Sequence, residues 1–416
     1  MIGQKISDKI KPIIGLVLFL FCIPSIILAQ QNLETANQAL RYSRYSRISL
    51  KIIPVEESNR TFLLQMTVEK IEEDIEFGSY EFYYGVVSSF QEPLTDQNLI
   101  RLNSQDIIRD TDYHYYFEKR VTVPESQQMA IALIKAVDTR QGDEYFYHMD
   151  LISPFIFGHS NFGVYYEDKI PFDQNFLIQN EPIEFKGRGI VNLHTFFYPN
   201  TFDVPMPPME IRPAPVPREV KVEYQGSFLA NLPKAFAGEG YYFIQSDTNS
   251  TQGVMLKTVH DIFPRVKDYD EMVDMVTYIS TRREHELLKE AADKKIALDQ
   301  YWYTLTKDTV SAKKLIKEYF KQIEFANILF TDFKEGWKTD RGMVYTVMGP
   351  PNEVYFRQDS ESWSYGTPDS ISKITFTFAR VKNILTPSFY TLNRSRALQP
   401  EWFKSITLWR NAQMVF

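Results

Sequence analysis

The most closely specified backbone in this chain of 416 residues is the segment 333–353, with the sequence FKEGWKTDRGMVYTVMGPPNE. Gly336 allows a sharp turn, and Trp337 offers a large apolar anchor. Thr339 and Asp340 carry side-chain oxygens that accept hydrogen bonds from nearby backbone N–H groups, which fixes tight turns. This combination predicts a rigid corner in the chain.

Asp340 and Arg341 have two interpretations. Arg341 is expected to pair with a carboxylate, for which Asp340 itself and Glu353 are the candidates. In the functional interpretation, Asp340 and Arg341 form a polar site beside an exposed Trp337 and bind a ligand or a carboxylate of a partner. In the structural interpretation, they hold a buried corner together. We favour the structural interpretation, because Gly, Pro, Asp and Trp are the residues that a rigid corner needs.

A strand is expected directly after the corner. Gly342 gives the backbone freedom to change direction, the segment 343–348 is predicted as the strand, and Gly349-Pro350-Pro351-Asn352 ends it with a rigid turn. Further strands rich in aromatic and β-branched residues are predicted over 354–357, 362–365, 374–378, 388–392 and 405–409. Together they indicate a small antiparallel sheet.

Helical patterns precede the corner. Thr281-Arg282-Arg283-Glu284 fits a capping box, so a long helix is expected from there to about Tyr303. Another helix is expected from Ser311 to Leu329, and a shorter one over 269–279. Residues 260–416 are therefore predicted to form an α+β domain in which a helical hairpin packs on the small sheet.

The chain before residue 260 is predicted to be mainly β. Short alternating strands separated by polar turns indicate an antiparallel β-sandwich-like domain over 47–152 and a second β-rich domain over 153–259. The segment 199–217 of the second domain is rich in proline, which cannot donate to a central ladder. We interpret it as an extended structural crossover, with a partner-docking polyproline motif as the alternative.

The first 29 residues have the pattern of a secretory signal peptide. Three lysines precede an apolar run over 13–28, Ala29 is small, and the chain turns polar at Gln30. Cleavage is expected between Ala29 and Gln30, with a retained N-terminal anchor as the alternative. The polar residues 30–46 are predicted as a flexible lead. After cleavage the chain keeps no cysteine, because its only one is Cys22, and no transmembrane span is expected.

The composition and the missing motifs argue against several classes of function. A formal charge of -7 gives no basic footprint for nucleic acid. The six histidines are scattered, and HExxH, GxSxG and P-loop patterns are missing from the sequence. We therefore expect no metal, no cofactor and no catalytic residues. Catalysis stays open only because carboxylate pairs for glycan hydrolysis can meet in the fold. Aromatic residues make up 15%, which suits strand cores and also suits stacking on sugars.

The string Gly336-Trp337-Lys338-Thr339-Asp340 resembles the motif of the GWxTD-domain family. The match extends over roughly 260–416, and Met343 departs from it, since a polar or basic residue is common there. The residues that carry this resemblance, and that we expect to be structural or partner-binding, are Gly336, Trp337, Thr339, Asp340, Arg341, Gly342, Gly349, Pro350, Pro351, Trp363 and Tyr365. The family name describes a motif and implies no particular activity.

The resemblance implies an exported bacterial envelope protein, notably of the Bacteroidetes type, with a β-rich region before the GWxTD domain. With the predicted signal peptide, it suggests a non-catalytic scaffold or partner-binding component of a cell-envelope assembly. We expect it in the periplasm or associated with the outer membrane, bound to a cell-envelope protein. The alternative is a carbohydrate-binding protein or a cryptic glycan hydrolase.

Overall fold

The computed structural model describes residues 31–72, 74–199, 201–211, 221–366, 373–383 and 385–414. The predicted signal peptide and its cleavage site between Ala29 and Gln30 lie outside these residues, as does part of the proline-rich segment.

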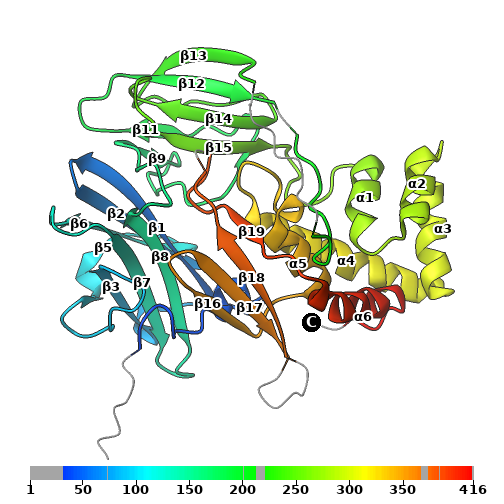
Figure 1. Ribbon diagram of the computed structural model, residues 1–416. Helices are drawn as coiled ribbons and strands as arrows, with labels where there is room; N and C mark the ends of the chain where they lie inside the picture. Colours follow the sequence, from blue (N-terminus) through cyan, green and yellow to red (C-terminus); the bar gives the residue numbers. More distant parts are fainter. Residues whose placement is uncertain are drawn as a thin grey trace, which may run out of the picture. The chain divides into compact units, whose positions relative to one another are not determined.

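The predicted N-terminal β-sandwich is present as two four-stranded antiparallel sheets, ordered β1-β2-β6-β5 and β4-β3-β7-β8 (Figure 1). Alternating side chains of both sheets meet in one core, which includes Leu64, Phe82, Phe117 and Ile134. The strands are β1 (Ile48–Ser58), β2 (Thr61–Lys70), β3 (Tyr80–Val87), β4 (Leu99–Leu102), β5 (Ile107–Asp110), β6 (His114–Thr122), β7 (Ala130–Asp138) and β8 (Glu144–Ile152).

A second β-rich region follows, with a five-stranded sheet ordered β10-β15-β14-β12-β13 and a separate β11-β9 pair. The pairing is antiparallel except between β10 and β15, which run parallel. The strands are β9 (Gly163–Tyr165), β10 (Leu177–Ile178), β11 (Glu184–Lys186), β12 (Asn192–Tyr198), β13 (Tyr224–Leu229), β14 (Gly240–Gln245) and β15 (Val254–Val259).

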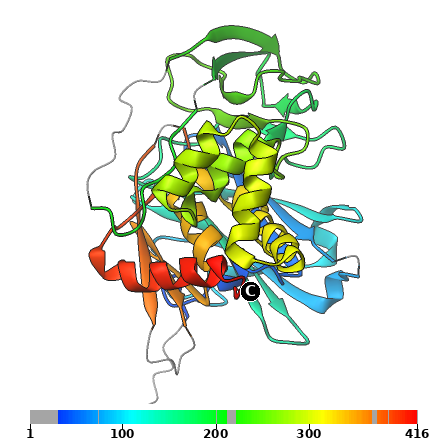
Figure 2. The ribbon, with the colours of Figure 1, turned by 90° about the vertical axis from the view of Figure 1, so that its right-hand side faces the viewer.

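The C-terminal region combines helices with a small antiparallel sheet, as predicted. The helices are α1 (Tyr269–Met275), α2 (Arg282–Glu290), α3 (Lys294–Thr306), α4 (Thr309–Phe330), α5 (Asp340–Met348) and α6 (Gln399–Arg410). The sheet has the order β16 (Glu353–Phe356), β17 (Ser360–Tyr365), β18 (Ile374–Arg380) and β19 (Tyr390–Leu392). Figure 2 shows α6 running across the lower end of the helical layer.

The predicted capping box is confirmed, but its helix is interrupted. The Thr281 hydroxyl accepts the Glu284 N–H, and the Glu284 side chain reaches back to the Thr281 backbone. Ala291 then adopts an extended conformation, and Asp293 caps a new helix by accepting the Ile296 N–H. The long helix expected to reach Tyr303 is therefore two helices, α2 and α3.

Two predicted strands are helices. The segment 343–348 belongs to α5, because the Thr339 hydroxyl accepts the Gly342 N–H and starts a helix at Asp340. Residues of this run such as Val344, Tyr345 and Val347 are buried on more than one side, so their apolar character reflects a fully enclosed helix. The segment 405–409 lies in α6, which begins with Pro400 in its first turn.

Residues 31–46, expected to be a flexible lead, pack against the C-terminal core. Leu33 and Tyr42 are buried in the same cluster as Trp363. The Gln38 N–H donates to the Val354 carbonyl of β16 at 2.9 Å, which places the segment beside the edge of the small sheet. A 3₁₀ helix spans Ala39–Tyr42. We call residues 31–46 the N-terminal strap.

The regions share cores as well as backbone contacts. Along β7, Ala132 and Ile134 face the sandwich core, while Ile131 and Leu133 belong to the cluster that contains the C-terminal region. This explains why β7 is apolar on both faces. Residues 31–416 form one compact unit. Within the described residues, the helices are all too short or too polar to cross a membrane.

Candidate functional site

The corner begins where η5, a 3₁₀ helix over Gly336–Lys338, passes very close to α4. A Cβ atom at Gly336 would lie 2.0 Å from the Ala326 carbonyl oxygen, so only glycine fits here. The Gly336 N–H donates to the Thr331 hydroxyl at 3.0 Å. The glycine of the motif is thus required by a close backbone approach.

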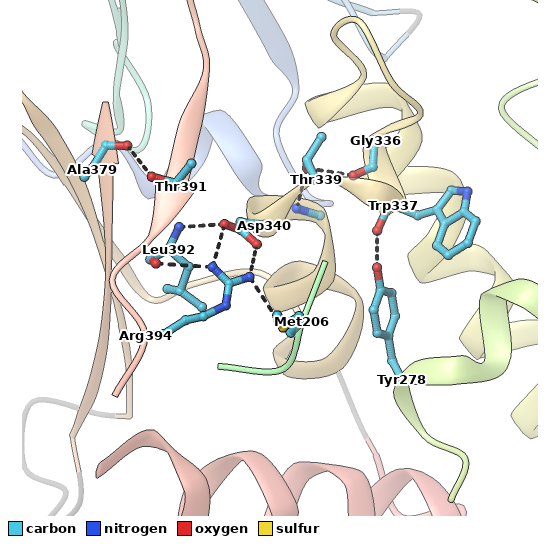
Figure 3. A network of polar contacts seen from close by, with 11 residues as sticks. Met206, Tyr278, Gly336, Trp337, Thr339, Asp340, Ala379, Thr391, Leu392 and Arg394 are labelled. Atoms are coloured by element: carbon cyan, nitrogen blue, oxygen red, sulfur yellow. Dashed lines mark hydrogen bonds and ion pairs between the residues drawn. The ribbon is translucent and has the colours of Figure 1, made fainter. Parts of the chain in front are cut away.

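Trp337 is an interior anchor. Its side chain is only 1% exposed. Its backbone N–H donates to Asn327 Oδ1 at 3.1 Å, and its carbonyl accepts the Tyr278 hydroxyl at 2.6 Å (Figure 3). The indole packs edge-on against Tyr278, with the ring centres 6.1 Å apart. The functional interpretation needed an exposed Trp337, and the structure shows a buried one.

Thr339 connects the corner to α5. Its hydroxyl donates to the Gly336 carbonyl at 2.7 Å (Figure 3) and accepts the Gly342 N–H at 2.9 Å. A Cβ atom at Gly342 would lie 1.9 Å from the Gly336 carbonyl oxygen. The second glycine is thus needed for close approach inside a helix, and not for entry into a strand.

Asp340 pairs with Arg394 rather than with Arg341. Arg394 Nη2 lies 2.6 Å from Asp340 Oδ1, and Nη1 lies 3.2 Å from Oδ2. Asp340 Oδ2 also accepts the Leu392 N–H at 2.7 Å, and Arg394 donates to the Met206 carbonyl at 3.0 Å (Figure 3). Asp340 therefore joins α5 to β19 and, through Arg394, to the described part of the proline-rich segment.

Arg341 pairs with Glu361, and not with either predicted partner, Asp340 or Glu353. Arg341 Nη1 lies 3.1 Å from Glu361 Oε2, and Glu361 is fully buried. Glu361 Oε1 accepts the Tyr42 hydroxyl at 2.7 Å and Trp363 Nε1 at 2.6 Å. Every donor that this buried carboxylate needs is thus supplied by the protein.

Tyr42 brings the N-terminal strap into this network. Burial raises the pKa of its hydroxyl well above the usual range, and the Glu361 carboxylate raises it further. The hydroxyl therefore stays protonated and donates. The Tyr42 carbonyl in turn accepts the Tyr345 hydroxyl at 3.0 Å, so the strap contacts α5 as well as β17.

Glu361 is the functional neighbour that sequence reasoning missed. It lies on β17 two and four residues before Trp363 and Tyr365, and alternate residues of a strand share one face. The sequence pattern that could have identified it is a carboxylate on the same face of a strand as two large aromatic residues. It indicates a buried acid that needs a buried cation, and Arg341 is that cation.

The turn after α5 is also held from within. Gly349 adopts a φ of 81°, in the left-handed region that favours glycine, and ends the helix. Its carbonyl accepts the Tyr365 hydroxyl at 3.0 Å. The Pro350-Pro351 pair then leads into β16, and Pro351 is buried.

The residue before the motif links it to the second β-rich region. Glu335 contacts Lys257 of β15 and also Lys338, each at 3.1 Å. Burial on its own would raise the pKa of Glu335, but these two ammonium groups outweigh it and lower the pKa to about 2. Glu335 is therefore ionised and connects β15 to the corner.

The arrangement is suited to holding chain segments together. The charged side chains of the motif, Asp340 and Arg341, are bound to internal partners. Among the described residues, no group of three or more His, Cys, Asp or Glu side chains is placed to hold a metal ion. Asp340 and Arg341 thus connect segments of the chain to one another.

Comparison with protein families agrees with the motif. Residues 240–411 match the family of the GWxTD domain, and the chain therefore carries a GWxTD domain. The match begins at the first residue of β14, earlier than the predicted start at 260, and so includes β15 with Lys257. The comparison with curated proteins found no match.

Proposed function

We propose that the protein is a non-catalytic, exported component of the cell envelope that acts as a scaffold or binds a protein partner. The observation that carries this proposal is the internal use of the GWxTD corner. Its charged groups bind the sheet and the proline-rich segment, and Glu361, the partner of Arg341, binds the N-terminal strap. Because the polar groups of the corner bind other parts of the same chain, they favour a role as a rigid frame that holds a binding surface in place.

Export is supported by the leader sequence. Charged residues, an apolar run and Ala29 form the order that signal peptidases recognise, and the only cysteine is removed with them. We propose a location in the periplasm or at the outer membrane. Mass spectrometry of the protein from its native host should give a chain that begins at Gln30, and a chain retaining its first 29 residues in a cytoplasmic fraction would contradict export.

A stable envelope partner is tested by photocrosslinking in the native host. The crosslinking residue replaces one exposed apolar side chain at a time, in four separate regions: Ile108, Tyr224, Leu287 and Phe403. We expect at least one position to give a single defined crosslink to an envelope protein, recovered in fixed stoichiometry. The chain recovered alone from all four variants would overturn the proposal.

The alternative, a carbohydrate-binding protein or glycan hydrolase, was suggested by aromatic residues that are mostly buried. Trp337 and Trp363 are buried, and so are Tyr115 and Tyr116 of the aromatic cluster in β6. Tyr113, beside that cluster, is 67% exposed and is a candidate for stacking on a sugar. Binding to a glycan array that Tyr113→Ala abolishes would favour this alternative over the scaffold.

A further inference from the structure

A cavity of about 600 Å³ lies inside the unit formed by residues 31–416. Its walls come from the N-terminal strap, β1, β8, β15, the end of α4 and residues within 380–383 and 385–390. It reaches the surface, because Ile71 and Phe157 line it and are 54% and 41% exposed. Its lining mixes aromatic rings with charged side chains, which is typical of ligand sites. We call it the Arg41 cavity.

Arg41 of the strap is an unpaired cation in this cavity. Its guanidinium carbon lies 4.2 Å from the ring centre of Tyr147 and 5.2 Å from that of Phe356. Among the described residues, no carboxylate forms an ion pair with Arg41, and its buried Nη1 atom has no hydrogen-bond partner. Arg41 as a whole is half-buried, but its Nη1 atom is buried, and a buried donor without an acceptor is costly. An oxyanion would supply that acceptor and a counter-charge.

The surroundings of Arg41 do not supply that anion. Arg380 is paired with Asp150 at 2.7 Å, yet its buried Nε atom also lacks an acceptor. His148 is a neutral imidazole and carries no charge, because burial lowers its pKa well below the usual range and Arg41 and Arg380 lower it further. Its Nδ1 atom is buried without a partner as well. Asp150 Oδ1, the second oxygen of the carboxylate that pairs with Arg380, is also buried without a partner. Arg380 is thus already neutralised, and Arg41 is the cation that lacks a counter-charge.

The acids elsewhere in the lining are unfavourable places for negative charge. Burial raises the pKa of Asp332 to about 6 and also raises that of Glu69. Asp173 accepts the Thr67 hydroxyl at 2.8 Å and is not paired with Arg41. The end of the cavity near Arg41 is thus the part with an unmatched positive charge.

We propose that the Arg41 cavity binds an amphipathic organic anion, with its oxyanion head on the Arg41 guanidinium and its apolar body against the aromatic lining. Arginine binds carboxylate and phosphate groups with two parallel N–H donors, so both heads fit the same chemistry. The rings of Tyr147 and Phe356 flank the head group, and Phe162, Phe172 and Phe243 line the rest. This inference does not depend on the envelope-scaffold proposal.

Calorimetric titration of the purified mature chain tests the site. The probes are laurate and dodecyl phosphate, below the concentrations at which they form micelles, with 1-dodecanol as the uncharged analogue and acetate and inorganic phosphate as anions without a tail. We expect saturable binding of one laurate or dodecyl phosphate per chain, and binding of the other three probes at least roughly tenfold weaker. Equal affinity for laurate and 1-dodecanol would overturn the proposal, as would no binding of either charged amphiphile.

Variants of the head-group residue make the test specific. Arg41→Gln should weaken laurate binding roughly 10- to 100-fold, while Arg41→Lys, which keeps the charge, should weaken it less. Arg283→Gln, at an exposed position on α2, is the matched control and should bind like the wild type. Unchanged affinity in a folded Arg41→Gln variant would refute the assignment. If the Arg41→Gln variant does not fold, the affinities of the wild-type chain for laurate and for 1-dodecanol test whether the site requires an anionic head group.

Discussion

Replacing Gly342 by alanine should destabilise the C-terminal region, although alanine is the better helix former. Gly342 is the third residue of α5, a position where alanine normally adds stability. Here the new Cβ atom would lie 1.9 Å from the Gly336 carbonyl oxygen, which belongs to the backbone and cannot rotate away. The helix and η5 must therefore move apart.

The expected magnitude combines three effects. Alanine in place of glycine gains about 1 kcal/mol of helix propensity. Separation of α5 from η5 breaks the Thr339 cap, which costs about 1 kcal/mol, and overpacking of an enclosed site costs about 1–3 kcal/mol. The net loss is therefore about 2 kcal/mol, opposite in sign to the effect of propensity alone.

Tryptophan fluorescence is a selective assay for this loss. All five tryptophans, Trp302, Trp337, Trp363, Trp402 and Trp409, lie in the GWxTD domain and are buried. Urea unfolding followed by this signal therefore reports on the domain that contains the substitution. The control is Gly78→Ala in the sandwich, where a Cβ atom meets nothing within 4 Å, and it should leave the tryptophan midpoint unchanged.

The outcome that refutes this reasoning is simple to recognise. A Gly342→Ala midpoint equal to or above that of the wild type would mean that α5 and η5 separate at no cost. The glycine would then not be explained by close approach, and the corner would not be the rigid element described above.

Three other predictions use the same assay. Trp337→Ala should cost about 3–5 kcal/mol because the side chain is 1% exposed, and an unchanged midpoint would argue for a surface role. Tyr42→Phe should cost about 2 kcal/mol by removing a hydrogen bond to the buried Glu361 carboxylate, and no loss would show that the strap contributes little. The hydrogen bond from Arg410 is the main cause that lowers the pKa of Glu284 to about 2. The ionised Glu284 should therefore stabilise the fold above about pH 4.3, and this stabilisation should be lost as the pH falls towards 2. The Glu284→Gln variant should lack this part of the pH dependence of stability.

The sandwich strands could be predicted because their signal is local. Phe62, Leu64, Met66 and Val68 alternate along β2 and lie in one core, and nothing distant is needed to recognise that pattern. The capping box at Thr281 is local in the same sense. The break between α2 and α3 was missed because the Asp293 cap falls inside a stretch that otherwise reads as continuous helix.

Helix α5 could not be predicted from its own residues. The run Met343–Met348 contains valine, threonine and tyrosine, which favour strands. The helix forms because Thr339 caps it, and because its run from Met343 to Val347 is buried on all sides. The cap is a local contact, but the burial depends on how the corner packs against α4 and the small sheet, and strand propensities carry no information about that packing.

The N-terminal strap was missed for a different reason. Its sequence is polar, and its order comes from partners more than 300 residues away, such as Glu361 for Tyr42. The same distance hid the true partners of Asp340 and Arg341, because Arg394 and Glu361 lie on other elements. Ion pairs between distant segments carry little signal in the sequence near either residue.

These contacts separate two kinds of residue. Gly336 and Gly342 are required by close approach, and Asp340 and Arg341 are neutralised by buried or half-buried partners, so substitutions there act first on stability. Arg41 has the opposite character, since it is a cation held without a counter-charge. A group that the fold leaves unsatisfied is a better indication of a ligand than one that the fold has already paired. Loss of function without loss of stability is therefore expected at Arg41, and loss of both is expected at the GWxTD corner.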